Sequence, residues 1–94
     1  MREKVIERRM CDMVRKRGGL TYKFVSPNNP GVPDRIVVTP TGAVWFVELK
    51  TATGKMAPMQ EWQKRELEKR GANVRKISGW EAAKDFVNEV MGNG

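Results

Sequence analysis

The first part of the chain carries a helical pattern of apolar residues. Between residues 2 and 17 apolar side chains recur three or four positions apart, and two glycines follow, which predicts an amphipathic helix that ends before Gly18. The members of this apolar stripe are Ile6, Met10, Met13 and Val14. At about 100° per residue, Glu3 and Glu7 fall inside the stripe or at its rim, which is an unusual place for a carboxylate. The ordinary explanation is that one of them pairs with a neighbouring arginine.

Three strands are predicted next along the chain. Residues 20–25 alternate and are rich in β-branched and aromatic side chains, and the turn-forming residues 26–31 indicate a loop. Residues 34–39 and 44–50 are typical of two strands joined as a hairpin by the sequence PTGA. The hairpin strands are apolar on both sides, so we expect both faces of the sheet to be covered.

The second half of the chain alternates helix, strand and helix. Pro58 suits the first position of a helix that continues to Gly71, and residues 72–77 form a short fourth strand. Ser78 and Glu81 match a capping box, which predicts that a final helix starts there. We therefore expect a single α/β domain over residues 1–94, in which helices flank a mixed central sheet.

Charge and missing residue types limit the chemistry that this domain could perform. The chain has 18 basic and 11 acidic residues, a net charge of +7, which favours a polyanionic partner because binding phosphates releases counterions. An ordinary cationic surface is the plainer interpretation. One cysteine and no histidine exclude an intrachain disulfide, the usual zinc sites and histidine-based triads. Any catalysis would depend on carboxylates, lysine, glutamine and a hard metal ion bound through oxygen.

The chain carries no sign of a membrane segment or a secretory signal. No apolar run approaches the roughly 18 residues of a membrane helix, and the first ten residues, MREKVIERRM, are too polar for a signal peptide. We therefore expect a cytoplasmic protein.

Charged residues lie at one end of the predicted hairpin. Strand alternation places Glu48 and Lys50 on one face. With a loop of residues 40–42, Asp34 lies opposite Glu48, with Cβ atoms about 5 Å apart, whereas a two-residue loop sends Asp34 to the other face. Singly, these are an ordinary turn residue and an ordinary ion pair. Together, two adjacent carboxylates would repel each other, and a divalent cation such as Mg²⁺ would stabilise them better than Lys50 alone.

This set of motifs resembles the PD-(D/E)xK nuclease superfamily, and the fuller set is similar to its small VRR-NUC branch. The resemblance covers residues 3–77 and rests on GVPDRIVV, FVELK, the helical segment IERRMCDMVRKRGG and the sequence PMQEW. It implies a restriction-endonuclease-like core with the order α-β-β-β-α-β-α. It also implies a metal-dependent endonuclease that hydrolyses phosphodiester bonds.

The same resemblance implies roles for individual residues. Asp34, Glu48 and the backbone carbonyl of Leu49 would bind the metal. Lys50 would orient the attacking water and stabilise charge on the phosphate, and Gln60 would reach toward the Lys50 side. Glu7 would complete the site from the first helix, with Glu3 as the weaker candidate.

The function implied by the resemblance is resolution of branched DNA, such as Holliday junctions, in a bacterial or phage-infected cell. Mg²⁺ would be the cofactor, with Mn²⁺ as a substitute. A four-way junction cut symmetrically needs two active sites, so a homodimer follows for that substrate. Two alternatives stay open: a nuclease for nicks, flaps or duplex, and a basic nucleic-acid-binding module without catalysis, in which the carboxylates only form ion pairs.

Overall fold

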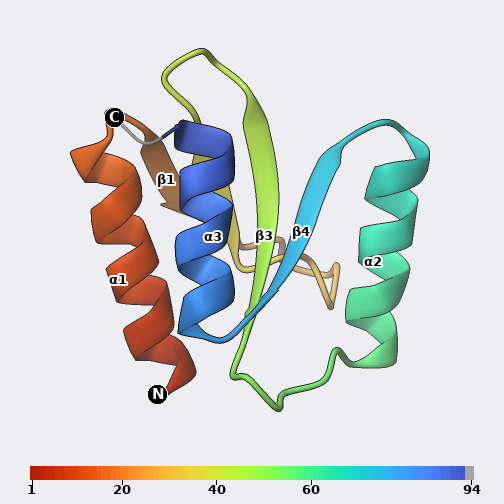
Figure 1. Ribbon diagram of the computed structural model, residues 1–94. Coiled ribbons are helices and arrows are strands. Elements are labelled where there is room, and N and C mark those ends of the chain that lie inside the picture. The colour runs from red at the N-terminus through yellow and green to blue at the C-terminus, as the bar shows by residue number, and fades with distance from the viewer. Residues whose placement is uncertain (93–94) are drawn as a thin grey trace.

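A computed structural model describes residues 1–92 as four strands and three helices in the predicted order (Figure 1). The strands form one sheet in the order β1-β2-β3-β4. They are β1 (Leu20–Lys23), β2 (Arg35–Val38), β3 (Val44–Lys50) and β4 (Asn73–Ser78). The first three strands are antiparallel neighbours, and β4 joins β3 in parallel, so the predicted mixed sheet is confirmed. The helices are α1 (Glu3–Lys16), α2 (Pro58–Lys69) and α3 (Trp80–Met91).

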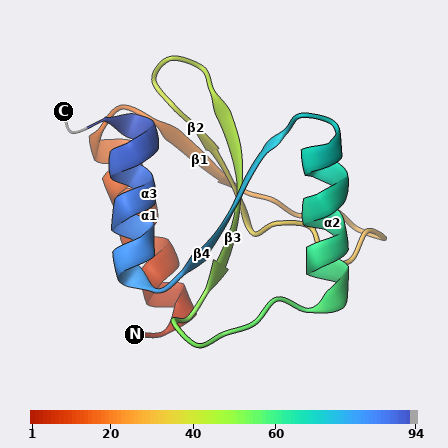
Figure 2. The ribbon, with the colours of Figure 1, turned by 45° about the vertical axis from the view of Figure 1, so that its right-hand side comes forward.

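Helices cover both faces of the sheet, as predicted. Figure 2 shows α1 and α3 together on one side of the sheet and α2 on the other side. The buried core lies between the sheet and the α1–α3 pair, and its largest apolar members are Ile6, Met10, Val14, Val37, Val47, Leu49, Ile77, Phe86 and Val87. In contrast, α2 has no fully buried residue. None of the described helices combines the length and apolar character needed to cross a bilayer.

The β2–β3 hairpin has the longer of the two loops considered from the sequence. The Thr39 N–H donates to the Ala43 carbonyl at 2.9 Å, which leaves three residues in the loop. Gly42 has a φ of +90° and donates its N–H back to the Thr39 carbonyl, as expected for a three-residue loop with glycine in the left-handed region. The resulting register pairs Arg35 with Val47 and, one step further, places Asp34 opposite Glu48.

The loop before β2 is packed against the start of α2. A Cβ added at Gly31 would lie only 2.6 Å from the backbone of Met59, and the φ of +84° at Gly31 also favours glycine. The side-chain amide of Gln63 donates to the Pro30 carbonyl at 3.2 Å. These contacts fix the first turn of α2 beside the loop that leads to Asp34.

The start of the last helix differs from the prediction. Ser78 does not cap α3, because it remains in β4 and pairs with Lys50 of β3. Gly79, with a φ of +90°, is the N-cap, and its N–H donates to the Lys50 carbonyl at 2.9 Å. The capping box of Ser78 and Glu81 was therefore a wrong prediction. The parallel pairing with β3 uses the residue that the local sequence pattern assigned to the helix.

Candidate active site

Charged and amide side chains converge where β3 ends and β2 begins. Glu48 is only 2% exposed, and its Oε2 accepts a hydrogen bond from Gln60 Nε2 at 2.8 Å. Lys50 Nζ lies 3.5 Å from the same oxygen. Asp34 Oδ2 accepts the backbone N–H of Leu49 at 2.8 Å. Four of the sequence-predicted residues, from β3, α2 and the position just before β2, therefore meet in one place, together with the Leu49 backbone.

Pro33 leaves the backbone carbonyl of Leu49 without a partner in the β2–β3 ladder. In this hairpin, Thr39 and Ala43 form a hydrogen-bonded pair, and such pairs recur at every second position. Extending the register places Pro33 opposite Leu49 in a pair of this kind. Proline has no N–H to donate, so the Leu49 carbonyl receives no ladder bond from Pro33. Within a strand, the N–H and the carbonyl of one residue point to the same side. Because the Leu49 N–H bonds Asp34, the Leu49 carbonyl oxygen also points to the side of β3 where Asp34 lies.

The carboxylate of Glu48 is buried and incompletely bonded. Its Oε1 atom has no hydrogen-bond partner among the described residues. Burial, and then the nearby negative charge of Asp34, raise the pKa of Glu48 to about 7, while Lys50 opposes the shift. A buried polar atom without a partner is unusual, and the raised pKa reflects the cost of the negative charge. A hard cation would supply both the partner and the missing positive charge.

The donor set fits a magnesium-like ion that keeps several water ligands. No group of three His, Cys, Asp or Glu side chains with metal-binding geometry occurs within residues 1–92. Two carboxylates and a backbone carbonyl leave the remaining positions of an octahedral shell to water or to substrate phosphate, which is the usual provision for Mg²⁺.

Gln60 links the start of α2 to the carboxylate. Its Oε1 accepts the backbone N–H of Ala57 at 2.8 Å, while its Nε2 donates to Glu48. These two bonds assign the amide orientation, because only oxygen can accept and only nitrogen can donate. Gln60 thereby satisfies a free backbone donor at the helix start and holds one oxygen of Glu48, leaving Oε1 as the unpaired atom.

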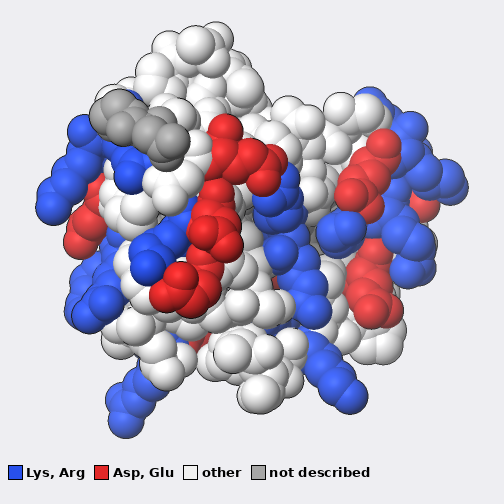
Figure 3. Space-filling view, in the orientation of Figure 1, with Lys and Arg blue, Asp and Glu red and all other residues white. Residues whose placement is uncertain are grey.

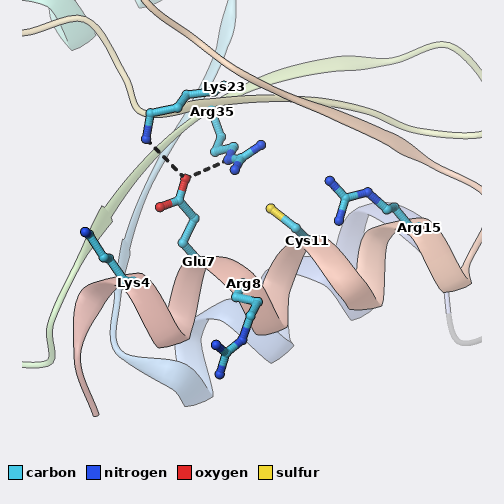
Figure 4. A pocket seen from close by; sticks show the side chains of 7 residues that line it. All are labelled: Lys4, Glu7, Arg8, Cys11, Arg15, Lys23 and Arg35. Atoms are coloured by element: carbon cyan, nitrogen blue, oxygen red, sulfur yellow. Dashed lines mark hydrogen bonds and ion pairs between the residues drawn. The ribbon is translucent and has the colours of Figure 1, made fainter.

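Glu7 is not brought to this cluster. Its Oε2 accepts a hydrogen bond from Arg35 Nε at 2.7 Å and lies 4.0 Å from Lys23 Nζ, as Figure 4 shows. These contacts are on the α1 side of the sheet, whereas the bond between Gln60 and Glu48 is on the α2 side. The described residues include no hydrogen bond or ion pair that joins Glu7 to the residues of the cluster. The ordinary explanation from the sequence, a pairing with an arginine, describes the contacts of Glu7, but the arginine is on β2. Glu3 is an exposed residue of the first turn of α1.

The partner of Glu7 was not identified from the sequence. The available signal was the position of Arg35 directly after Asp34, since strand alternation turns consecutive side chains to opposite faces. This rule places Arg35 on the face that a helix before the sheet would cover.

Comparisons with known proteins give relatives by sequence and by fold. No family model matches the sequence. The protein "Putative nuclease p44" of Acyrthosiphon pisum secondary endosymbiont phage 1 is 50% identical over 60 residues, which are 64% of this chain and 64% of the phage protein. The match thus spans slightly less than two thirds of that relative. A solved structure described as "VRR_NUC domain" is 27% identical with a TM-score of 0.84, over 92% of this chain and 94% of that chain.

The antiparallel strands β1 to β3, the parallel addition of β4 and the helices on both faces define a restriction-endonuclease-like α/β fold. The structural match spans nearly the whole length of both chains, so the chain is similar in fold to a VRR-NUC domain, and it shares half of the aligned residues with the phage protein. The family resemblance predicted from the motifs is confirmed.

Proposed function

We propose that this protein is a metal-dependent DNA endonuclease that hydrolyses phosphodiester bonds at the site around Asp34 and Glu48. The observation that carries the proposal is the buried Glu48 carboxylate, one oxygen of which has no partner among the described residues and whose pKa is raised to about 7. The structural similarity to a VRR-NUC domain and the name of the phage relative support the same activity.

In this proposal one divalent cation is held by Asp34, Glu48 and the backbone carbonyl of Leu49. The cation is Mg²⁺, and Mn²⁺ can replace it. Such a cation would polarise a phosphate oxygen and lower the pKa of a bound water. The arrangement of the backbone supports this assignment, since Pro33 offers no donor to the Leu49 carbonyl and Asp34 already bonds the Leu49 N–H.

Lys50 and Gln60 have different roles in the proposed site. Lys50 is 16% exposed at its side chain and is the cation beside the carboxylates, so it can donate to the phosphate oxygens as negative charge develops and orient the attacking water. Gln60 positions Glu48 by binding Oε2. Glu7 has no role in this chemistry as we propose it, because Arg35 and Lys23 hold its carboxylate on the α1 side.

We propose branched DNA, such as a four-way junction, as the substrate and a homodimer as the active form. Symmetric cutting of a junction needs two sites, and a second copy supplies the second one. The sheet face opposite α1 offers apolar surface for such contact, because the side chains of Leu20, Tyr22 and Val44 are 53%, 56% and 43% exposed.

Cleavage of end-labelled DNA by the purified protein tests these proposals together. A four-way junction, a flap and a plain duplex are each incubated with Mg²⁺, Mn²⁺ or EDTA. Lys50→Ala is compared with Lys84→Ala, a matched lysine replacement on α3. We expect paired symmetric cuts in the junction that are lost in EDTA and with Lys50→Ala but retained with Lys84→Ala.

The other outcomes separate the alternatives. Metal-dependent cutting of flap or duplex alone keeps the nuclease and rejects the junction as substrate. DNA binding without metal-dependent cleavage of any substrate contradicts the nuclease and leaves a basic binding module. Light scattering on the free protein and on its junction complex gives the oligomeric state, and a monomer in both would contradict the homodimer.

A further inference from the structure

A basic pocket lies between α1 and the first two strands, on the side of the sheet away from Glu48 and Gln60. Its volume is about 330 Å³. It is lined by five cations and one carboxylate over a buried thiol, namely Lys4, Arg8, Arg15, Lys23, Arg35, Glu7 and Cys11 (Figure 4). One carboxylate therefore faces five positive charges, and the pocket carries a clear excess of positive charge.

Most hydrogen-bond donors of this pocket are free within the described residues. Arg35 has five N–H donors, and its bond to Glu7 uses only Nε. Its two terminal nitrogens, each with two N–H groups, make no hydrogen bond to residues 1–92. Lys4 and Arg8 form no ion pair within the same range, and the Lys23 side chain is 66% exposed. The free terminal side of a guanidinium matches two oxygens of a phosphate group.

The opposite charge is concentrated on a different helix. The exposed face of α3 carries Glu81, Asp85 and Glu89, and Figure 3 shows acidic side chains gathered over this helix. Glu81 pairs with Lys84 and Glu89 pairs with Arg75, so these ion pairs partly neutralise the acidic face of α3. The pocket beside α1 keeps its excess of positive charge and is the side that attracts a polyanion.

We propose that this pocket binds a backbone phosphate of the DNA strand next to the phosphate that is cut. The proposal rests on the proposed function. Asp34 and Arg35 are consecutive, with Cα atoms about 3.8 Å apart. Because their side chains leave the chain in different directions, one strand that crosses this end of the sheet can meet both the cluster at Glu48 and the pocket. Glu7 then acts as a positioning residue that holds Arg35 in place through Nε while the terminal nitrogens bind the phosphate.

Binding of a short fluorescent DNA duplex in EDTA, followed by anisotropy across a salt series, tests the pocket without any cleavage. The pocket variant combines Lys4→Ala, Arg8→Ala and Arg15→Ala. The matched control combines Lys16→Ala, Lys69→Ala and Lys84→Ala, which are helix lysines outside the pocket. Both variants remove three positive charges from a net charge of +7. Circular dichroism and urea denaturation verify that both fold.

We expect the pocket variant to bind at least about tenfold more weakly at 0.1 M salt, and its salt slope to fall by about 1 for each DNA phosphate that it no longer binds. The control should weaken binding by less than about threefold, since it removes only the general attraction. Equal decreases of affinity and equal slopes in the two variants would overturn the pocket.

The Arg35 side chain gives a second readout and separates a DNA phosphate from a free anion. The proposal expects the NMR signal of the Arg35 Nε–H to shift on adding a short oligonucleotide, and to shift little with inorganic phosphate at the same phosphate concentration and ionic strength. An equal shift with inorganic phosphate contradicts recognition of a strand. No shift with either ligand contradicts the pocket as a whole.

The failures of the two proposals are distinguishable. If the wild-type protein cleaves DNA but the pocket and control variants bind it alike in EDTA, the pocket proposal fails and the nuclease stands. If the wild-type protein never cleaves but the pocket variant alone loses binding, the nuclease fails and the pocket remains a DNA-binding site.

Discussion

Replacing Glu48 by glutamine should stabilise the metal-free protein at alkaline pH. The carboxylate is 2% exposed, and burial and Asp34 raise its pKa to about 7 from an unperturbed value of 4.5. A glutamine has nearly the same shape without the charge, and its side-chain oxygen can still accept the hydrogen bond from Gln60. The substitution therefore removes a buried charge while it keeps the local packing.

The magnitude follows from the pKa shift. Each pKa unit corresponds to about 1.4 kcal/mol, so a rise from 4.5 to about 7 costs the ionised native state about 3 kcal/mol. The folded protein binds the proton more tightly than the unfolded chain, so this cost is absent below pH 4.5, grows as the pH rises and is complete above about pH 7. We expect Glu48→Gln to raise the free energy of unfolding by about 2 to 3 kcal/mol at pH 8, and by little at pH 4.5.

Urea denaturation in EDTA at pH 4.5 and pH 8 measures this difference, with Glu61→Gln, at an exposed position of α2, as the matched control. Repeating the series with Mg²⁺ should stabilise the wild-type protein at pH 8 and leave Glu48→Gln nearly unchanged, because ligand binding stabilises only a protein that holds the ligand. If Glu48→Gln lowers stability at pH 8 in EDTA, the carboxylate serves a structural ion pair with Lys50. The binding module would then be the better interpretation.

Three further substitutions test the surroundings of the site. Gly31→Ala should lower the free energy of unfolding by about 2 kcal/mol or more, because its Cβ would lie 2.6 Å from the Met59 backbone; a decrease below about 0.5 kcal/mol in urea denaturation would contradict this packing. Pro33→Ala supplies an N–H that can bond the Leu49 carbonyl, so we expect Mg²⁺ to bind about tenfold more weakly in calorimetry. An unchanged affinity would show that this carbonyl does not bind the metal. Gln60→Ala should lower the free energy of unfolding by about 1 to 3 kcal/mol, because the Ala57 N–H and the Glu48 Oε2 atom both lose a hydrogen bond. An unchanged free energy of unfolding in urea would contradict the linking role of Gln60.

The hairpin that carries the site was predictable because its signals are local. The glycine of PTGA allows the left-handed residue of a three-residue loop, and that loop alone fixes which residue lies opposite Glu48. The sequence PTGA is compatible with either register, so the pattern alone does not decide between the two loop lengths. The effect of Pro33 on the Leu49 carbonyl follows only from the register, which places the two residues opposite each other.

The position of Glu7 could not be predicted from the helix pattern. Periodicity gives the angle of a residue around the helix axis, but not the rotation or the height of that helix over the sheet. In the structure, Ile6, Met10 and Val14 are buried against the sheet, and this packing turns Glu7 toward β1 and β2. The start of α3 was mispredicted for a related reason, because the pairing of β4 with β3 involves residues distant in sequence and outweighs a local capping signal.

Asp34 and Arg35 explain how a strongly basic protein can keep two carboxylates together and still present positive charge to a polyanion. Consecutive residues at the start of a strand direct their side chains differently, so the acid reaches the backbone of Leu49 and the base reaches Glu7 on the α1 side. Glu48 is buried, and this burial together with the negative charge of Asp34 raises its pKa to about 7, which keeps the metal-free site partly protonated near neutral pH. By contrast, four cations of the pocket are exposed, namely Lys4, Arg8, Arg15 and Lys23, whereas the Arg35 side chain is only 18% exposed. In the proposed function, DNA approaching from solution therefore meets these exposed cations first, and the negative charge at Glu48 becomes complete only when a proton is lost or a cation binds.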